Sequence, residues 1–147
     1  MRFPLLKQQS EKDCGPTCLR MICEFHGKIY RIRFANIKYQ IDSNGMSLKN
    51  MALAAESIGL IAIPAKIDIY TLERSVLPLI VHWKGSHFVV VHKANHKYIW
   101  IADPAKGGKK YKKNAFINYW INSNQDKTHV YGTALILKPI KSPRFSK

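Results

Sequence analysis

Apolar side chains near the start of the chain recur at the spacing of a helix. The apolar positions are Cys18, Met21, Ile22 and Phe25. Asp13 can cap the N-terminus of this helix, and Pro16 falls in its first turn, where a missing N–H costs nothing. Gly27 is a suitable residue for its end. The pattern therefore predicts an amphipathic helix that begins at Cys14.

A second helix and several shorter elements are predicted further along the chain. Ser47 is a suitable N-cap and Gly59 a suitable C-cap, and the apolar residues between them share one face of a helix. That face holds Leu48, Met51, Ala52, Ala55 and Ile58. Further patterns predict strands over 60–67, 77–83 and 133–137 and short helical stretches over 69–76 and 115–122.

Two runs rich in β-branched and aromatic residues, 87–92 and 98–102, predict an antiparallel hairpin. With the turn centred near residue 95, His87 falls opposite Asp103, and the two side chains become neighbours. A slip of one residue would place them on opposite faces of the sheet. Asp103 is followed by Pro104 and a pair of glycines, which predict that the chain leaves the sheet in a turn.

Composition and charge narrow the class of protein. The chain has 147 residues, of which 46% are hydrophobic, enough for one globular domain and too many for a disordered polypeptide. The net charge is +15, and residues 106–147 hold ten of the 24 Lys and Arg but only one acid, Asp126. Such a surface is either simply solvated or faces an anionic partner: nucleic acid, the cytoplasmic leaflet of a membrane, or an acidic peptide. We expect no nucleic-acid partner, because the basic residues are not interleaved with aromatics in a known binding module.

The cysteines and the apolar runs indicate a reducing compartment. Cys14, Cys18 and Cys23 are an odd number crowded into one stretch, which is a poor disulfide framework. The N-terminus lacks the apolar run of a secretory signal, and no segment approaches the roughly 20 apolar residues of a membrane span. We therefore expect a soluble domain that faces the cytosol.

Cys14 lies where a thiolate is stabilised, at the N-terminus of a helix. His87 could then exchange protons with the thiol and the leaving amine, and Asp103 could orient the imidazole. The backbone N–H of Cys14 and the side-chain amide of Gln8 could hold a developing oxyanion. Gly15 would leave room for a substrate backbone. Together these residues predict an acyl-transfer site.

Each of these residues has another interpretation when taken alone. A cysteine near a helix start is often a small buried hydrophobe, and we assign Cys18 and Cys23 to that class. Zinc binding is disfavoured, since Cys14 and Cys18 are not matched by a Cys-x-x-Cys pair. His92 is an alternative base, but no carboxylate falls opposite it. The remaining histidines have no evident partner: His26, His82, His96 and His129.

Four blocks of the sequence resemble the C39 family of cysteine peptidases, the papain-like domain at the N-terminus of bacteriocin-processing ABC transporters. The blocks are Gln8 to Pro16, Gly45 to Leu48 entering a helix that ends at 58–60, His87 to Val91, and Asp103-Pro104 with the glycine pair. The resemblance covers about residues 6–138. It implies an α+β papain-like fold, in which the helix that carries Cys14 packs on an antiparallel sheet that carries His87 and Asp103.

The resemblance also implies a function. It is that of a leader peptidase that cleaves a precursor after a Gly-Gly or Gly-Ala type sequence, with Cys14, His87, Asp103 and Gln8 as the catalytic residues and no cofactor. Residues 1–138 would form the peptidase domain and 139–147 a basic tail or linker toward a transmembrane region. The implied partners are the leader peptide and the transmembrane and ATPase parts of an exporter, with ATP bound only by the latter, at the cytoplasmic face of the cell membrane.

Two alternatives stay open from the sequence alone. Related domains of some toxin exporters lack the nucleophile and merely bind cargo, although Cys14 argues against that function here. A papain-like site can also pass its acyl group to an acceptor other than water, as an acyltransferase does.

Overall fold

The computed structural model describes residues 2–37, 39, 45–121 and 131–140. The helices of this part are α1 (Cys14–His26), α2 (Lys28–Asn36), α3 (Leu48–Ser57), α4 (Ile69–Arg74) and α5 (Lys113–Trp120). The strands are β1 (Leu60–Ile67), β2 (Leu79–Trp83), β3 (His87–Ala94), β4 (Tyr98–Asp103), β5 (Gly107–Lys112) and β6 (Gly132–Pro139). All strand pairs are antiparallel, in the order β1-β6-β2-β3-β4-β5.

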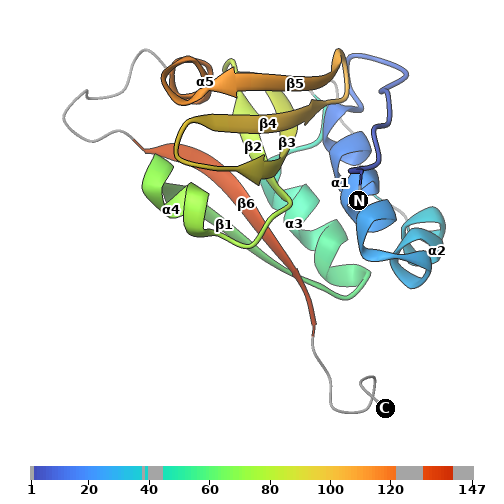
Figure 1. The fold of residues 1–147 in the computed structure, drawn as a ribbon. Helices are drawn as coiled ribbons and strands as arrows, with labels where there is room; N and C mark the ends of the chain where they lie inside the picture. Colours follow the sequence, from blue (N-terminus) through green and yellow to red (C-terminus); the bar gives the residue numbers. More distant parts are fainter. Residues whose placement is uncertain (1, 38, 40–44, 122–130, 141–147) are drawn as a thin grey trace.

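The sheet buries apolar side chains on both of its faces. On one face α1 and α3 cover a cluster that includes Ile80, Val90 and Leu135. On the other face Trp83 and Ile99 pack with Phe116 of α5. In Figure 1 the helices α1 and α3 lie together beside the sheet, and α5 lies near β5 at the other end. The predicted α+β arrangement, with the helix of Cys14 packed against an antiparallel sheet, is confirmed.

The start of α1 differs from the prediction in one respect. Asp13 occupies the N-cap position, but its side chain makes no capping hydrogen bond to the helix. Its carboxylate accepts instead from the backbone N–H groups of Gln9, at 3.1 Å, and Ser10, at 2.9 Å. The predicted side-chain cap is therefore wrong, because the loop that precedes the helix competes for the same carboxylate. The Asp13 carboxylate thus stabilises the loop before α1 and accepts no hydrogen bond from the N–H groups at the start of the helix.

The register of the β3–β4 hairpin is shifted from the prediction by two residues. Val90 pairs with Ala102 and Val91 with Ile101, and a β-bulge follows between Val91 and Lys93. Continuing this register brings Asp103 opposite position 89, so direct pairing with His87 was wrong. A shift of two residues preserves the face of a strand, and diagonal neighbours remain within reach of one another. The bulge alters the register by only one residue, and the rest of the difference comes from the turn, which is closed by Asn95 and Tyr98 and so lies further along the chain than predicted. The two side chains stay on the same face.

Two elements were not predicted from the sequence. The helix α2 follows α1 after a single glycine, Gly27, whose φ of 117° breaks the helical path. The strand β5 pairs with β4 from Asp103↔Gly107 to Tyr98↔Lys112, where only a turn was expected. Ser47 caps α3 as predicted, with its side chain accepting from the backbone N–H of Asn50 at 3.1 Å.

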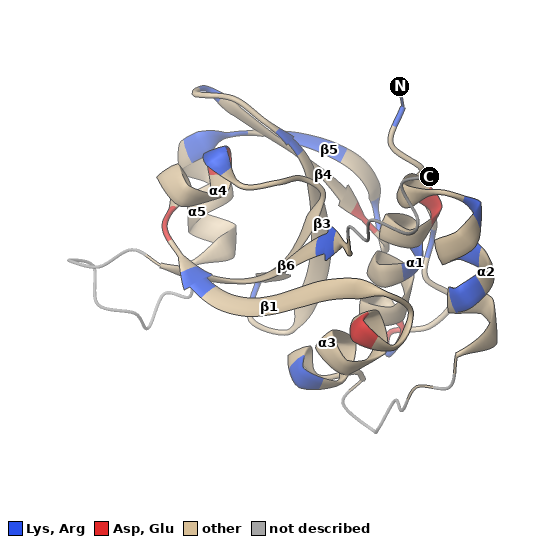
Figure 2. Cartoon of the chain, turned by 90° about the horizontal axis from the view of Figure 1, so that it is seen from below, with Lys and Arg blue, Asp and Glu red and all other residues tan. Residues whose placement is uncertain are grey.

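Basic residues are spread over the surface of the fold. Figure 2 shows Lys and Arg on α2, α3, β1 and β5, with few acidic positions among them. β6 runs to Pro139, and residues 141–147 of the predicted basic tail lie outside the described residues.

Candidate active site

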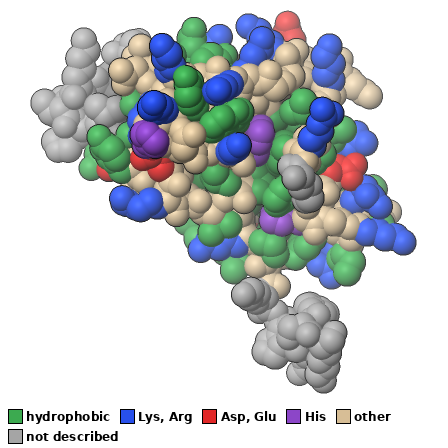
Figure 3. Space-filling view, viewed as in Figure 1, with side chains coloured by type: hydrophobic (Ala, Val, Ile, Leu, Met, Phe, Trp, Pro, Cys, Tyr) green, Lys and Arg blue, Asp and Glu red, His purple; other side chains and the backbone are tan. Residues whose placement is uncertain are grey.

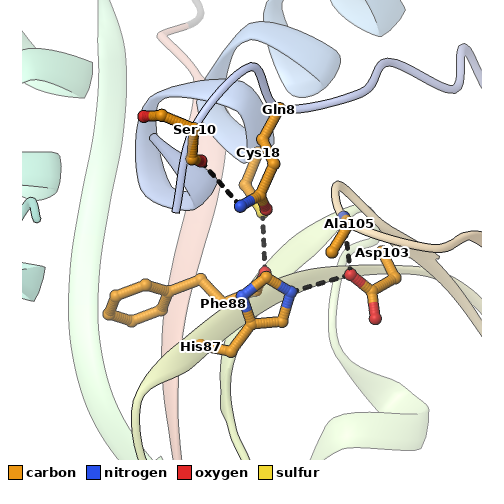
Figure 4. Close-up of polar contacts among 7 residues, drawn as sticks. All are labelled: Gln8, Ser10, Cys18, His87, Phe88, Asp103 and Ala105. Carbon is orange, nitrogen blue, oxygen red and sulfur yellow. Dashed lines mark hydrogen bonds and ion pairs between the residues drawn. The ribbon is translucent and has the colours of Figure 1, made fainter. Parts of the chain in front are cut away.

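The four predicted site residues come from separate parts of the chain and lie close together. Cys14 begins α1, His87 begins β3 and Asp103 ends β4. Gln8 belongs to the segment before α1, and its backbone N–H donates to the carbonyl of Pro104 at 2.8 Å. This bond ties the N-terminal segment to the turn that follows Asp103. Figure 4 shows Gln8, His87 and Asp103 gathered at this place.

His87 and Asp103 form a direct hydrogen bond. Nε2 of His87 lies 2.7 Å from Oδ1 of Asp103, which also accepts from the backbone N–H of Ala105 at 2.8 Å. Only 5% of Asp103 is exposed. Because an ionised carboxylate can only accept, Nε2 carries a proton. The other ring nitrogen, Nδ1, is therefore the one left to exchange a proton with Cys14.

The surroundings of Cys14 favour its thiolate. Burial alone would raise the pKa of Cys14, which is 8% exposed, but hydrogen bonds to the His87 side chain and to the Phe88 and Gly15 backbones hold that pKa below its ordinary value. Burial alone would lower the pKa of His87, but the hydrogen bonds to Asp103 and Cys14 raise it to about 9. The two opposite shifts therefore favour the thiolate of Cys14 and the imidazolium of His87 over the neutral pair.

The other two cysteines have a different chemistry. Cys18 is fully buried and donates its Sγ–H to the carbonyl of Phe88 at 3.3 Å, as Figure 4 shows. Burial raises the pKa of Cys18 well above its ordinary value, and burial also raises the pKa of Cys23 to about 12. Both side chains are thus neutral thiols that pack in the core.

Gln8 and Gly15 differ in how well they match their predicted surroundings. The Gln8 amide donates from Nε2 to the Ser10 carbonyl at 2.7 Å, and its Oε1 is buried with no partner among the described residues. An amide nitrogen has two protons, so one N–H remains available.

A Cβ on Gly15 would meet Sδ of Met51 at 3.0 Å and Cβ of Met46 at 3.3 Å. Gly15 therefore lets α1 approach α3, and the space predicted there for a substrate backbone is filled by methionine.

A cleft of about 500 Å³ opens beside His87 and Asp103. It is lined by Gln8, Glu11, Lys12, Trp83, Lys84, Ser86, His87, Asp103, Ala105 and Lys106. Sequence reasoning missed the lining contributed by Lys84, Ser86 and Lys106. Their only sequence signal is position, since they occupy the turns next to the two catalytic candidates.

A second cavity, of about 530 Å³, lies apart from this cleft. Its walls are formed by Phe3, Leu5, Phe25, His92, Trp100 and Ile101, with Gly108 and the basic residues Arg2, Lys93, Lys109 and Lys110. His92 stacks on Phe3 there, with ring centroids 4.7 Å apart, and burial lowers its pKa. Among the described residues His92 therefore lacks the carboxylate partner expected of a general base. Of the other histidines, His129 lies outside the described residues.

The described residues offer neither a metal-binding cluster nor a membrane-spanning helix. No group of three or more His, Cys, Asp or Glu in that part of the chain could hold a metal ion. None of the helices described is both long and apolar enough to span a membrane.

The chain is similar to known proteins over most of its length. A family model described as "Peptidase C39 family" matches residues 2–124. The lactococcin-G-processing and transport ATP-binding protein of Lactococcus lactis subsp. lactis is 37% identical over 109 residues, 70% of this chain and 16% of that protein. The colicin V secretion/processing ATP-binding protein of Escherichia coli is 30% identical over 106 residues, 72% of this chain and 15% of that protein. The chain thus spans a small fraction of these relatives.

The fold is also similar to that of a solved structure. It is the crystal structure of a double glycine motif protease from an AMS/PCAT transporter in complex with the leader peptide. It superposes with a TM-score of 0.75 and 26% sequence identity over 95% of this chain and 93% of that chain.

Proposed function

Because the chain belongs to the peptidase C39 family, with its papain-like fold, we propose that it is a cysteine endopeptidase that removes the leader from a secreted precursor peptide. The cleaved bond follows a Gly-Gly or Gly-Ala type sequence. The observation that carries the proposal is the chain of hydrogen bonds from Asp103 through His87 to Cys14, in which the pKa of the thiol is lowered. Such a pair attacks a peptide carbonyl without an external activator.

Two steps of acyl transfer account for the reaction. The Cys14 thiolate attacks the carbonyl carbon of the second glycine, and the resulting oxyanion accepts from the backbone N–H of Cys14 and the free N–H of Gln8. Protonated His87 gives its Nδ1 proton to the leaving nitrogen, so the C–N bond breaks and a thioester remains on Cys14. His87 then takes a proton from water as the water oxygen attacks the thioester, and the C–S bond breaks to release the leader acid, which loses its remaining proton to solvent. Cys14 departs as thiolate and His87 keeps the proton taken from water, so the starting thiolate and imidazolium are restored.

The leader is proposed to bind as an amphipathic helix in an apolar groove. The cavity lined by Phe3, Leu5, Phe25 and Trp100 supports this part of the proposal. The segment from Arg2 to Gln8 connects that cavity to the site, so a bound leader could extend from one to the other. A narrow passage at Cys14 would exclude side chains next to the cleaved bond and so select glycine.

The partners follow from the relatives, which are named as transport and processing proteins. We propose that the chain acts beside the transmembrane and ATPase parts of an ABC exporter, at the cytoplasmic face of the membrane. The positive charge of the chain suits a place near anionic lipid headgroups. ATP binding belongs to the ATPase part, and the peptidase reaction derived above requires no cofactor.

Mass spectrometry tests the proposal directly. A synthetic leader peptide with a Gly-Gly junction is incubated with the wild-type chain and with Cys14→Ala, and cleavage after the second glycine by the wild type alone is expected. If both proteins bind several such leaders and cut none, the cargo-binding alternative is correct. If the leader is recovered attached to an added amine, the acyltransferase alternative is correct. Reaction with iodoacetamide at neutral pH, expected first at Cys14, reports the thiolate independently.

A further inference from the structure

The position of His87 indicates which part of the substrate occupies the cleft beside it. The leaving nitrogen must lie within hydrogen-bonding reach of the His87 imidazole, because this ring protonates it. The residues that follow the cleaved bond therefore leave Cys14 on the side of His87. The cleft of about 500 Å³ lined by His87 and Asp103 lies on that side. Taking the proposed function as the starting point, this cleft receives the first residues of the released cargo.

The rim of this cleft is basic. Lys12, Lys84 and Lys106 line it together with one acidic side chain at the rim, Glu11, and all four residues are exposed. The ion pairs found in the described part of the chain involve none of the three lysines. The ammonium of Lys84 lies 4.6 Å from the centroid of the Tyr119 ring, a contact that leaves its charge without an anion. The rim thus carries three lysines against one exposed carboxylate, Glu11, and so has an excess of positive charge.

The distance of the lysines from the reacting atoms defines which residues of the cargo they meet. Lys84 precedes His87 by three positions, and Lys106 follows Asp103 by three, with its backbone N–H donating to the Asp103 carbonyl at 3.1 Å. Both lysines lie in turns, and the hydrogen bond from Lys106 to Asp103 closes a β-turn whose ends are less than about 7 Å apart. At about 3.3 Å per residue, an extended cargo covers that distance with its second residue, and its third residue stays within reach of the long lysine side chains. The first residue lies instead beside Cys14, His87 and Asp103, short of both lysines.

We propose that this basic rim is a binding subsite for acidic side chains at the second and third positions after the cleaved bond. The occupant is the cargo part of the precursor, a peptide whose carboxylates complement Lys84 and Lys106. Exposed charge pairs are individually weak, and two or three of them together favour an acidic over a basic cargo by about ten-fold.

Peptides that differ only after the cleaved bond test the subsite. Three substrates share one leader and its Gly-Gly junction and carry Asp-Asp, Asn-Asn or Lys-Lys at the second and third positions. For the wild-type chain, kcat/KM should fall from Asp-Asp through Asn-Asn to Lys-Lys by about ten-fold in total, and salt should compress the difference. In the double variant Lys84→Glu/Lys106→Glu the order should reverse.

A matched control separates a local subsite from the overall charge. The double variant Lys49→Glu/Lys66→Glu changes the net charge by the same amount at exposed positions of α3 and β1, outside the cleft. It should keep the wild-type order. Equal kcat/KM for all three peptides, or a reversal in the control variant as well, would overturn the subsite while leaving leader cleavage intact. Failure of the wild type to cleave any of the three would overturn the proposed function and the subsite with it.

Discussion

The two ring nitrogens of His87 have different partners, and this difference governs how the site responds to pH. Nε2 is bonded to Asp103 at 2.7 Å, while the Cys14 thiol takes part in the hydrogen bond that raises the pKa of the ring. The two shifts reinforce one another: the thiolate favours the imidazolium, and the imidazolium favours the thiolate. An active enzyme with Cys14 as nucleophile needs both charges at once.

The pH profile of kcat/KM should therefore be bell-shaped, with a broad plateau between its acid and alkaline limbs. On the acid side activity appears as Cys14 loses its proton, below the ordinary pKa of a thiol; on the alkaline side it is lost as His87 loses its proton, near pH 9. Asp103→Asn removes the carboxylate that raises the pKa of His87, so the alkaline limb should move to lower pH. A variant with reduced kcat and an unmoved alkaline limb would show that Asp103 does not set the charge of the imidazole.

Gln8 is expected to act on the transition state rather than on binding. Gln8→Ala removes an N–H from the oxyanion, which should lower kcat by about 100-fold with KM little changed. Gln9→Ala is the matched control, because Gln9 is an exposed neighbour for which the structure gives only a backbone hydrogen bond. Steady-state kinetics on one leader peptide measures both. A Gln8→Ala enzyme that loses affinity but keeps kcat would contradict the assignment.

Residue types and spacing predicted the residues of the candidate site better than they predicted the residues around it. Cys14, His87 and Asp103 could be placed together because each ends or begins an element with a strong pattern, and their catalytic roles stay predictions that the variants above test. The Asp13 cap failed because a loop competed for the carboxylate. The lysines at the rim of the cleft depend on how the turns fold over the sheet, which no local pattern encodes.

Among the secondary-structure elements, α5 is held on the sheet by a contact that only glycine permits. A Cβ on Gly132 would lie 2.1 Å from Cε2 of Trp120, and the Trp120 indole donates to the carbonyl of Thr133 at 3.0 Å. Trp120 is 4% exposed, so the ring has little space into which it could move. The end of α5 and the start of β6 therefore fit only when position 132 has no side chain.

Gly132→Ala should lower the free energy of unfolding by about 1–3 kcal/mol, the usual cost of overpacking a core. Gly108→Ala is the control, because its Cβ would meet Leu5 at an ordinary 3.4 Å on an exposed part of β5. That variant should stay within about 0.5 kcal/mol of the wild type. Denaturant unfolding followed by tryptophan fluorescence measures both. Equal stabilities for the two variants would mean that Trp120 repacks freely.

The elements that the sequence did not reveal are those with a weak apolar pattern. The helix α2 has no buried residue, so no apolar stripe distinguishes it from a loop. The strand β5, Gly-Gly-Lys-Lys-Tyr-Lys, is half lysine and begins with two glycines, and it forms because it can pair with β4 at the edge of the sheet. By contrast, α1, α3 and the apolar strands were predicted because their side chains face the core. The strand β5 forms through its tertiary pairing with β4, which a local sequence pattern does not encode.

At the scale of the whole molecule, the main property is a positive field. The net charge is +15, and Figure 3 shows Lys and Arg side chains spread over the face seen there with few acidic ones between them. A field of this kind raises the rate at which an anionic peptide meets the protein, and it acts over a Debye length of about 10 Å at 0.1 M salt. The basic rim of the cleft is a local part of the same charge distribution.

For an acidic leader peptide, kcat/KM should therefore fall steeply as ionic strength rises from about 0.01 to about 1 M, since the Debye length shrinks from about 30 to about 3 Å. The value of kcat at saturation should change little, because Cys14 and Asp103 are buried and His87 is half-buried, so salt screens them less than the surface charges. A leader of the same length with its acids replaced by amides is the control and should show a shallow dependence. Alkylation of Cys14 by neutral iodoacetamide provides a second control, since its rate involves no charged reagent. If both leaders respond to salt equally, the charge of the chain serves a partner other than its substrate, and electrostatic steering of the leader is excluded.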